Sequence, residues 1–129
     1  MFDWNRFVKL GKILFDNSDE ESMCTAISRF YYGIFDVVRR YLIRVKHKYS
    51  LARRDGDVHR EVFDEIRNSK DNTLKEISNI FNKLRVARNH ADYDDDFDKN
   101  YFKNFFQANE KELHIAFEAL NYLKSNPNY

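Results

Sequence analysis

The scarcity of chain-breaking residues constrains this sequence more than any other feature. Only three glycines and one proline, Pro127, occur in 129 residues, whereas a sheet protein of this length needs many of these turn-forming residues. Long helices therefore account for the chain better than strands do. The length and a hydrophobic content of 43% predict a single domain over residues 1–129, with an apolar core of its own.

Apolar residues recur at intervals of three and four along most of the chain, as they do on the buried face of a helix. The pattern predicts helices over about 3–15, 18–47, 58–66, 73–88 and 101–123. Ser18 with Glu21, and Thr73 with Glu76, have the spacing of a capping box, which satisfies backbone N–H groups where a helix begins. The polar stretch 46–57 reads as a mobile loop. We therefore expect an all-α fold, a four- to five-helix antiparallel bundle.

The charge balance bears on the choice of partner. The 22 basic and 21 acidic residues nearly cancel, so no long-range positive field draws in nucleic acid, and any RNA contact must be local. One basic stretch could follow a phosphate backbone or could equally form a solvated helix end. It comprises Arg39, Arg40, Arg44, Lys46, Lys48, Arg53 and Arg54.

The expected compartment is the cytoplasm. Cys24 is the only cysteine, which excludes an intramolecular disulfide and fits a reducing environment. No apolar run approaches the roughly 20 residues that cross a bilayer, and the amino terminus lacks the apolar region of a signal peptide. We therefore expect no association with a membrane.

Several kinds of chemistry lack their usual motifs. The sequence has no glycine-rich phosphate loop, serine elbow or paired cysteines, and no two of its four histidines have metal-ligand spacing. We expect neither a metal nor a cofactor. His114 is expected to be packed or capped. The five aspartates between 92 and 98 lack the glycine and glutamate of a calcium loop, and are expected to form a turn and start the last helix.

Two arginines and a histidine lie near the end of the fourth predicted helix. Arg85 and Arg88 are neighbours on its surface, while His90 lies about 140° round an ideal helix from Arg85. Arg85 and His90 could meet one phosphate if the helix loosens at its end, or if each comes from a different copy across a dimer axis. A histidine that moves a proton and a forked arginine that holds charge suit metal-free RNA cleavage. Alternatively, both arginines are solvated, Arg88 pairs with Asp92, and His90 hydrogen-bonds near the helix end.

Three segments resemble the HEPN domain family, and they occur in the family's order. Residues 26–35 (AISRFYYGIF) resemble the signature of its second helix, and residues 58–63 (VHREVF) resemble the histidine-bearing start of its third. Residues 84–94 (LRVARNHADYD) resemble its late Leu-x-x-x-Arg-x-x-Ala-Asp-Tyr-Asp motif. The resemblance covers nearly the whole chain and implies a four- to five-helix bundle of HEPN type, commonly a homodimer.

The family resemblance also implies an activity. Many HEPN proteins are metal-independent ribonucleases of toxin–antitoxin or defence systems, with a catalytic arginine followed by four to six residues and then a histidine. Arg85 and His90 match this motif with four intervening residues. The resemblance implies that Arg85 stabilises charge on the RNA phosphate and that His90 is the base or acid in attack by the 2′-hydroxyl. The residues expected to support this pair or bind substrate are Arg88, Asn89, Asp92, Tyr93 and His59.

A second hypothesis is a non-catalytic HEPN module that binds a nucleotide or a nucleotidyltransferase-type antitoxin partner. Val86 follows Arg85 at a position where active members often carry Asn, Asp or His, and the near-neutral charge also fits such a module. The arginines would then be structural or interfacial. The two hypotheses differ in whether Arg85 and His90 act on RNA.

Overall fold

The computed structural model of the chain describes residues 20–53, 55–93 and 99–129, with side chains described for 25–53, 55–90 and 104–129. Within these residues the chain forms four α-helices and one short 3-10 helix, and no strand. They are α2 (Glu20–Arg44), η1 (Tyr49–Ala52), α3 (Val58–Arg67), α4 (Asn72–Tyr93) and α5 (Lys99–Lys124). The predicted all-α class is confirmed. The helix predicted over 3–15 and the cap predicted at Ser18 lie outside the described residues.

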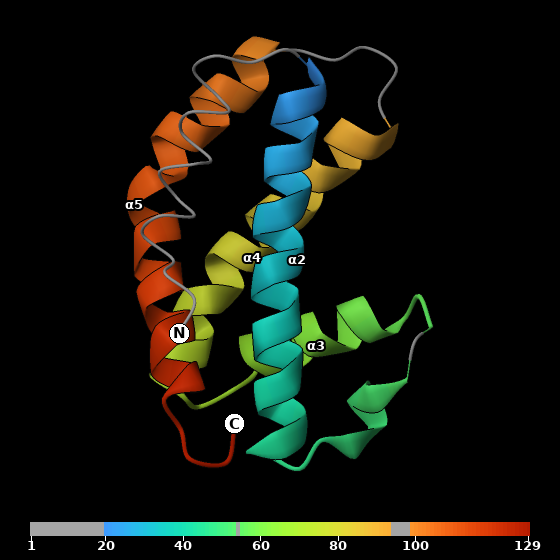
Figure 1. Ribbon diagram of the computed structural model, residues 1–129, viewed down its shortest axis with the longest axis vertical. Helices are drawn as coiled ribbons and strands as arrows, with labels where there is room; N and C mark the ends of the chain where they lie inside the picture. The colour runs from blue at the N-terminus through green and yellow to red at the C-terminus, as the bar shows by residue number, and fades with distance from the viewer. Residues whose placement is uncertain (1–19, 54, 94–98) are drawn as a thin grey trace.

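Three long helices form the body of the bundle. α2, α4 and α5 each pack against the other two, and α4 runs in the opposite direction to α2 and α5 (Figure 1). The shorter α3 lies crosswise to α2 in this view and packs mainly on α4. This arrangement brings the start of α3 to the middle of α2 and the second half of α4.

Aromatic rings fill much of the core. On one side of α2, Phe30 lies 5.9 Å from the ring of Phe106 and 5.8 Å from that of Phe117, which joins α2 to α5. On the other side, the rings of Tyr31 and Phe81 stack at 5.2 Å, which joins α2 to α4. The apolar stripe predicted for α4 is buried as expected, with Leu74, Ile77, Phe81 and Leu84 all at 1% exposure or less.

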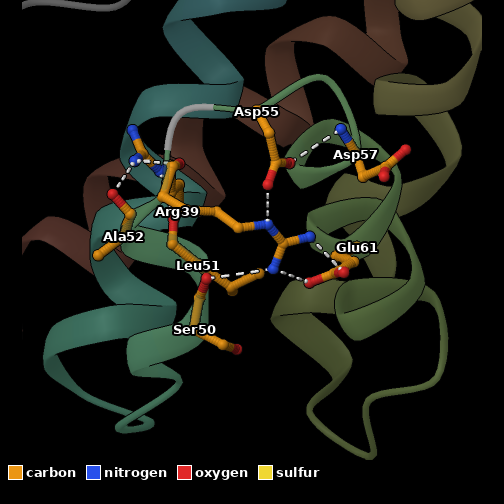
Figure 2. A network of polar contacts seen from close by, with 8 residues as sticks. Arg39, Ser50, Leu51, Ala52, Asp55, Asp57 and Glu61 are labelled. Carbon is orange, nitrogen blue, oxygen red and sulfur yellow. Dashed lines mark hydrogen bonds and ion pairs between the residues drawn. The ribbon is translucent and has the colours of Figure 1, made fainter.

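The segment predicted as a mobile loop is instead attached to two helices. It contains η1, whose Leu51 is buried. Arg39 of α2 donates hydrogen bonds to the carbonyl oxygens of Leu51, Ala52 and Arg53, at 2.7, 3.1 and 3.1 Å (Figure 2). The Arg53 guanidinium binds the carboxylates of Asp55 and of Glu61 on α3 (Figure 2). Long-range contacts of side chains thus fix a stretch whose local sequence is typical of a loop.

The capping residue predicted for α4 was wrong by two positions. The Asp71 carboxylate, directly before Asn72, accepts a hydrogen bond from the backbone N–H of Thr73 at 2.9 Å. Asp and Thr are both favoured caps, but the aspartate also places a negative charge at the positive end of the helix. At the other end, α4 includes Asp92, which was expected in a turn. The aspartates at 94–98 lie outside the described residues.

Candidate functional site

A continuous helix carries the predicted catalytic pair. α4 extends through Tyr93, so it does not loosen at His90 as one of the two predicted arrangements required. In an ideal helix the Cα atoms of Arg85 and His90 are about 7.5 Å apart along the axis and about 140° apart around it. Arg85 is half-buried and His90 is exposed. One chain therefore does not bring the pair to a common point, and a second copy is the remaining arrangement.

The surface between these two residues is uncharged. Around an ideal helix, Asn89, Val86 and His90 follow Arg85 in order, at about 40°, 100° and 140°. All three are exposed, and Val86 is 43% exposed although it is apolar. None carries a permanent charge, in a chain that is 33% charged residues. We call Val86, Asn89 and His90 the outer face of α4.

Both arginines of α4 lie against aromatic rings and are half-buried, so they are only partly solvated, not fully solvated as the alternative interpretation held. The guanidinium carbon of Arg85 lies 5.5 Å from the centre of the Phe63 ring, and Nη2 donates to Oδ1 of Asn82 at 3.2 Å. The Arg88 guanidinium carbon lies 5.0 Å from the ring centre of Tyr31 and 5.3 Å from that of Tyr32. Its Nη1 also donates to the Tyr32 hydroxyl. Cation–π contacts of this kind stabilise a positive charge in a partly dry setting.

His59 joins the same group of residues from the first turn of α3. Its Nδ1 lies 2.8 Å from the Tyr31 hydroxyl, and its ring stacks on Phe35 with the ring centres 4.0 Å apart. Burial raises the pKa of Tyr31 to about 12, so the phenol keeps its proton at neutral pH. We call these five residues the tyrosine–arginine cluster: the buried Tyr31, and Tyr32, His59, Arg85 and Arg88, which are at least partly exposed.

The structure groups the predicted residues differently from the sequence analysis. It brings Arg85, Arg88 and His59 into one cluster but leaves His90 on the outer face of α4. Asn89 accepts a hydrogen bond from Nη2 of Arg88 at 3.5 Å. The side chains of Asp92 and Tyr93 lie outside the described residues, and so does the predicted pair of Arg88 with Asp92.

Tyr31 and Tyr32 were missed as site residues, although both stand in the family-like segment 26–35. Tyr31 belongs to the apolar stripe of α2, which predicts a core residue. Tyr32 stands off that stripe, and it is 42% exposed. An aromatic residue on the polar side of an amphipathic helix was the available signal.

His59 is expected to make stability depend on pH. Burial, and then the charges of Arg88 and Arg39, lower the pKa of His59 from its ordinary 6.5, while Asp36 acts in the opposite direction. The unfolded chain therefore takes up this proton at a higher pH than the folded chain does. Neutral His59 therefore contributes its full stabilisation of the folded state above pH 6.5. This contribution is lost as the pH falls from 6.5 through the lowered pKa of the folded state.

We expect the free energy of unfolding, measured by urea denaturation, to decrease between about pH 7 and pH 5, and to decrease less in His59→Gln. The same substitution at the exposed His114 is the matched control. A pH slope in His59→Gln equal to that of the wild type would contradict the assignment to His59.

The sequence predicts that His114 is packed or capped. His114 is neither packed nor capped as expected, because it is 50% exposed on α5 with its Nε2 3.0 Å from the Glu118 carboxylate.

Among the residues whose positions are described, no three His, Cys, Asp or Glu side chains gather as metal ligands would. No helix in the described part of the chain combines the length and apolar character that crossing a membrane requires.

The described residues of the basic stretch, 39–53, are largely occupied by contacts within the protein. Arg39 and Arg53 hold η1, as described above. Arg40 lies over the ring of Tyr129, 4.8 Å from its centre, and Arg44 donates to the backbone oxygen of the same residue at 3.2 Å. Lys46 and Lys48 line an open cleft of about 420 Å³, whose walls also carry Asp64, Glu65 and Asp71. These contacts make the stretch a poor track for a phosphate backbone.

Two adjoining surfaces therefore carry chemistry that a function could use. One is the outer face of α4, flanked by Arg85. The other is the tyrosine–arginine cluster, to which Arg85 also belongs. No family model matches this chain, and neither does any curated protein or solved structure.

Proposed function

We propose that the protein is a homodimeric, metal-independent endoribonuclease of HEPN type that acts in a toxin–antitoxin or defence system. One observation carries the proposal: Arg85 and His90 stand on the two sides of an exposed, uncharged surface centred on Val86. The order of the three family-like segments supports the same reading. The functional unit is then a pair of chains.

The outer face of α4 suits contact with a second copy of itself. Packing on Val86 and Asn89 buries an apolar side chain and a neutral amide, which avoids the cost of burying an unpaired charge. Where two such helices cross about a two-fold axis, Arg85 of one copy can meet His90 of the partner subunit. Active HEPN proteins often carry a polar residue at the position of Val86. In the proposed dimer, the apolar side chain of Val86 lies at the centre of the contact.

Such a junction has the groups that metal-free RNA cleavage needs. The imidazole of His90 takes the proton of a 2′-hydroxyl, whose oxygen bonds to the adjacent phosphorus while the bond from phosphorus to the 5′ oxygen breaks. The forked guanidinium of Arg85 stabilises the added negative charge of the phosphorane. A proton from an imidazolium or water completes the departing 5′-hydroxyl. The other product is a 2′,3′-cyclic phosphate.

Cleavage of single-stranded RNA in the presence of EDTA tests the proposal. We expect Arg85→Ala and His90→Ala each to lower the initial rate by about 100-fold or more, as the loss of a general base or a charge-stabilising group does. His114→Ala, which removes a histidine from the surface of α5, is the control and retains the rate. Equal rates in all four proteins, or no cleavage by the wild type, would refute the proposal.

A non-catalytic HEPN module is the second candidate function. It is favoured by the separation of Arg85 and His90 around one helix, which needs no explanation if the two never act together. Such a module would bind a nucleotide or a nucleotidyltransferase-type partner. Sedimentation separates the candidates, because the ribonuclease requires a dimer of this chain alone, whereas the module does not.

A further inference from the structure

Tyr32 presents an oriented aromatic ring to solvent, and the proposed reaction does not use it. Tyr32 as a whole is 42% exposed. It meets Tyr31 edge-on, with ring centres 5.2 Å apart at 78°. Arg88 holds it from another side, 5.3 Å from the ring centre and with a hydrogen bond to the hydroxyl. A ring fixed in this way loses little conformational freedom when a flat ligand stacks on it.

Two arginines of α4 bring positive charge near this ring. Arg85 and Arg88 are three residues apart on α4 and therefore neighbours on its surface. Both charges lower the pKa of Tyr31 against the larger effect of burial, and Arg88 also lowers the pKa of His59. Asp36, one turn after Tyr32 on α2, acts to raise the pKa of His59. Arg88 thus places a positive charge directly against the exposed ring of Tyr32, and the charge of Arg85 acts on the neighbouring Tyr31.

We propose that Tyr32 and Arg88 form a subsite for one nucleotide of single-stranded RNA, with the base stacked on Tyr32 and the phosphate bound by Arg88 and Arg85. Every base has a π-face, so a ring beside an arginine binds single strands with little sequence preference. The flat, forked guanidinium suits a phosphate better than an ammonium does. The inference rests on the proposed function because Arg85 would link this subsite to the cleaved bond.

Binding can be measured apart from cleavage by using His90→Ala as the parent protein, so that the RNA stays intact. The affinity for a short labelled single-stranded RNA is measured by fluorescence anisotropy at fixed salt. Adding Tyr32→Ala is expected to raise the Kd by roughly 5- to 100-fold, as the loss of a stacking ring does. Tyr32→Phe keeps the ring and should keep most of the affinity. The matched control is Tyr122→Ala, which removes an exposed tyrosine from α5 and should leave the Kd unchanged.

Two further binding measurements distinguish base stacking on Tyr32 from other roles of this residue. A duplex of the same sequence, whose bases are already stacked within it, should show little dependence on Tyr32. If Tyr32→Ala does not fold, Tyr32→Leu replaces the ring by an apolar side chain without a π-face, and the same loss is expected. Thermal unfolding of each variant establishes that the compared proteins are folded.

An unchanged Kd in Tyr32→Ala would overturn the subsite. An equal loss in Tyr32→Ala and Tyr32→Phe would also overturn it, because Tyr32 would then act only by holding Arg88 through its hydroxyl. If RNA binding depends on the Tyr32 ring while the wild type cleaves no RNA, the subsite stands and the proposed ribonuclease fails. If the wild type cleaves RNA but binding does not depend on the Tyr32 ring, the proposed ribonuclease stands and the subsite fails.

Discussion

An equimolar mixture of the Arg85→Ala and His90→Ala proteins is expected to cleave RNA at about a quarter of the wild-type rate, although each protein alone is expected to be slower than the wild type by about 100-fold or more. Random pairing makes half of the dimers mixed. In a mixed dimer, one junction lacks both side chains, and the other joins an intact Arg85 to an intact His90 of the partner subunit. The initial rate of cleavage in EDTA, after the two proteins are refolded together, measures the recovery.

The control for this experiment is a mixture of Arg85→Ala with the double variant Arg85→Ala/His90→Ala, in which no dimer contains an intact junction. Native mass spectrometry shows whether mixed dimers have formed. If they form and no activity returns, Arg85 and His90 do not act across the dimer, and the arrangement proposed for the outer face of α4 is wrong.

Replacing Phe81 by alanine is expected to lower the free energy of unfolding by about 3–5 kcal/mol. Phe81 is fully buried, and its ring centre lies 5.2 Å from that of Tyr31 and 6.1 Å from that of Phe63. These two rings support Arg88 and Arg85, respectively. Loss of the Phe81 ring therefore leaves a cavity directly beneath the tyrosine–arginine cluster.

Guanidinium denaturation followed by circular dichroism measures this loss. Phe81→Leu, which keeps most of the apolar volume, is expected to cost less than about 1.5 kcal/mol. Phe117→Ala removes a buried ring from the contact of α2 with α5, so it is a control for ring removal away from the cluster. A loss of less than about 1.5 kcal/mol in Phe81→Ala would contradict the central place given to this ring.

Periodicity predicted the helices because burial of one face repeats along each of them. The predicted helix 58–66 became α3, Val58–Arg67. Along α4, the stripe that buries Leu74, Ile77 and Leu84 reaches Arg88 where an apolar residue was due. The structure gives the reason for that irregularity, since the guanidinium of Arg88 lies on rings of α2 as an apolar side chain would.

The contacts that assemble the cluster could not be predicted from local patterns. Tyr31 and His59 are 28 residues apart in sequence, and nothing in either segment specifies that their polar atoms meet. Likewise, Arg39 appeared as one member of a basic stretch, because its hydrogen bonds run to carbonyl groups that every residue possesses. Sequence patterns indicate which face of a helix is buried. They do not indicate which polar atoms of two packed helices become partners.

The double attachment of η1 ties the placement of His59 to the length of the connection between α2 and α3. Arg39 fixes the carbonyl groups of residues 51–53 to α2. The side chain of Arg53 joins the same stretch to Glu61, two residues beyond His59 on α3. The segment therefore fixes the position of the first turn of α3 along α2. A residue inserted between 53 and 58 would shift the imidazole relative to Tyr31 while leaving the contacts of α2 with α5 in place.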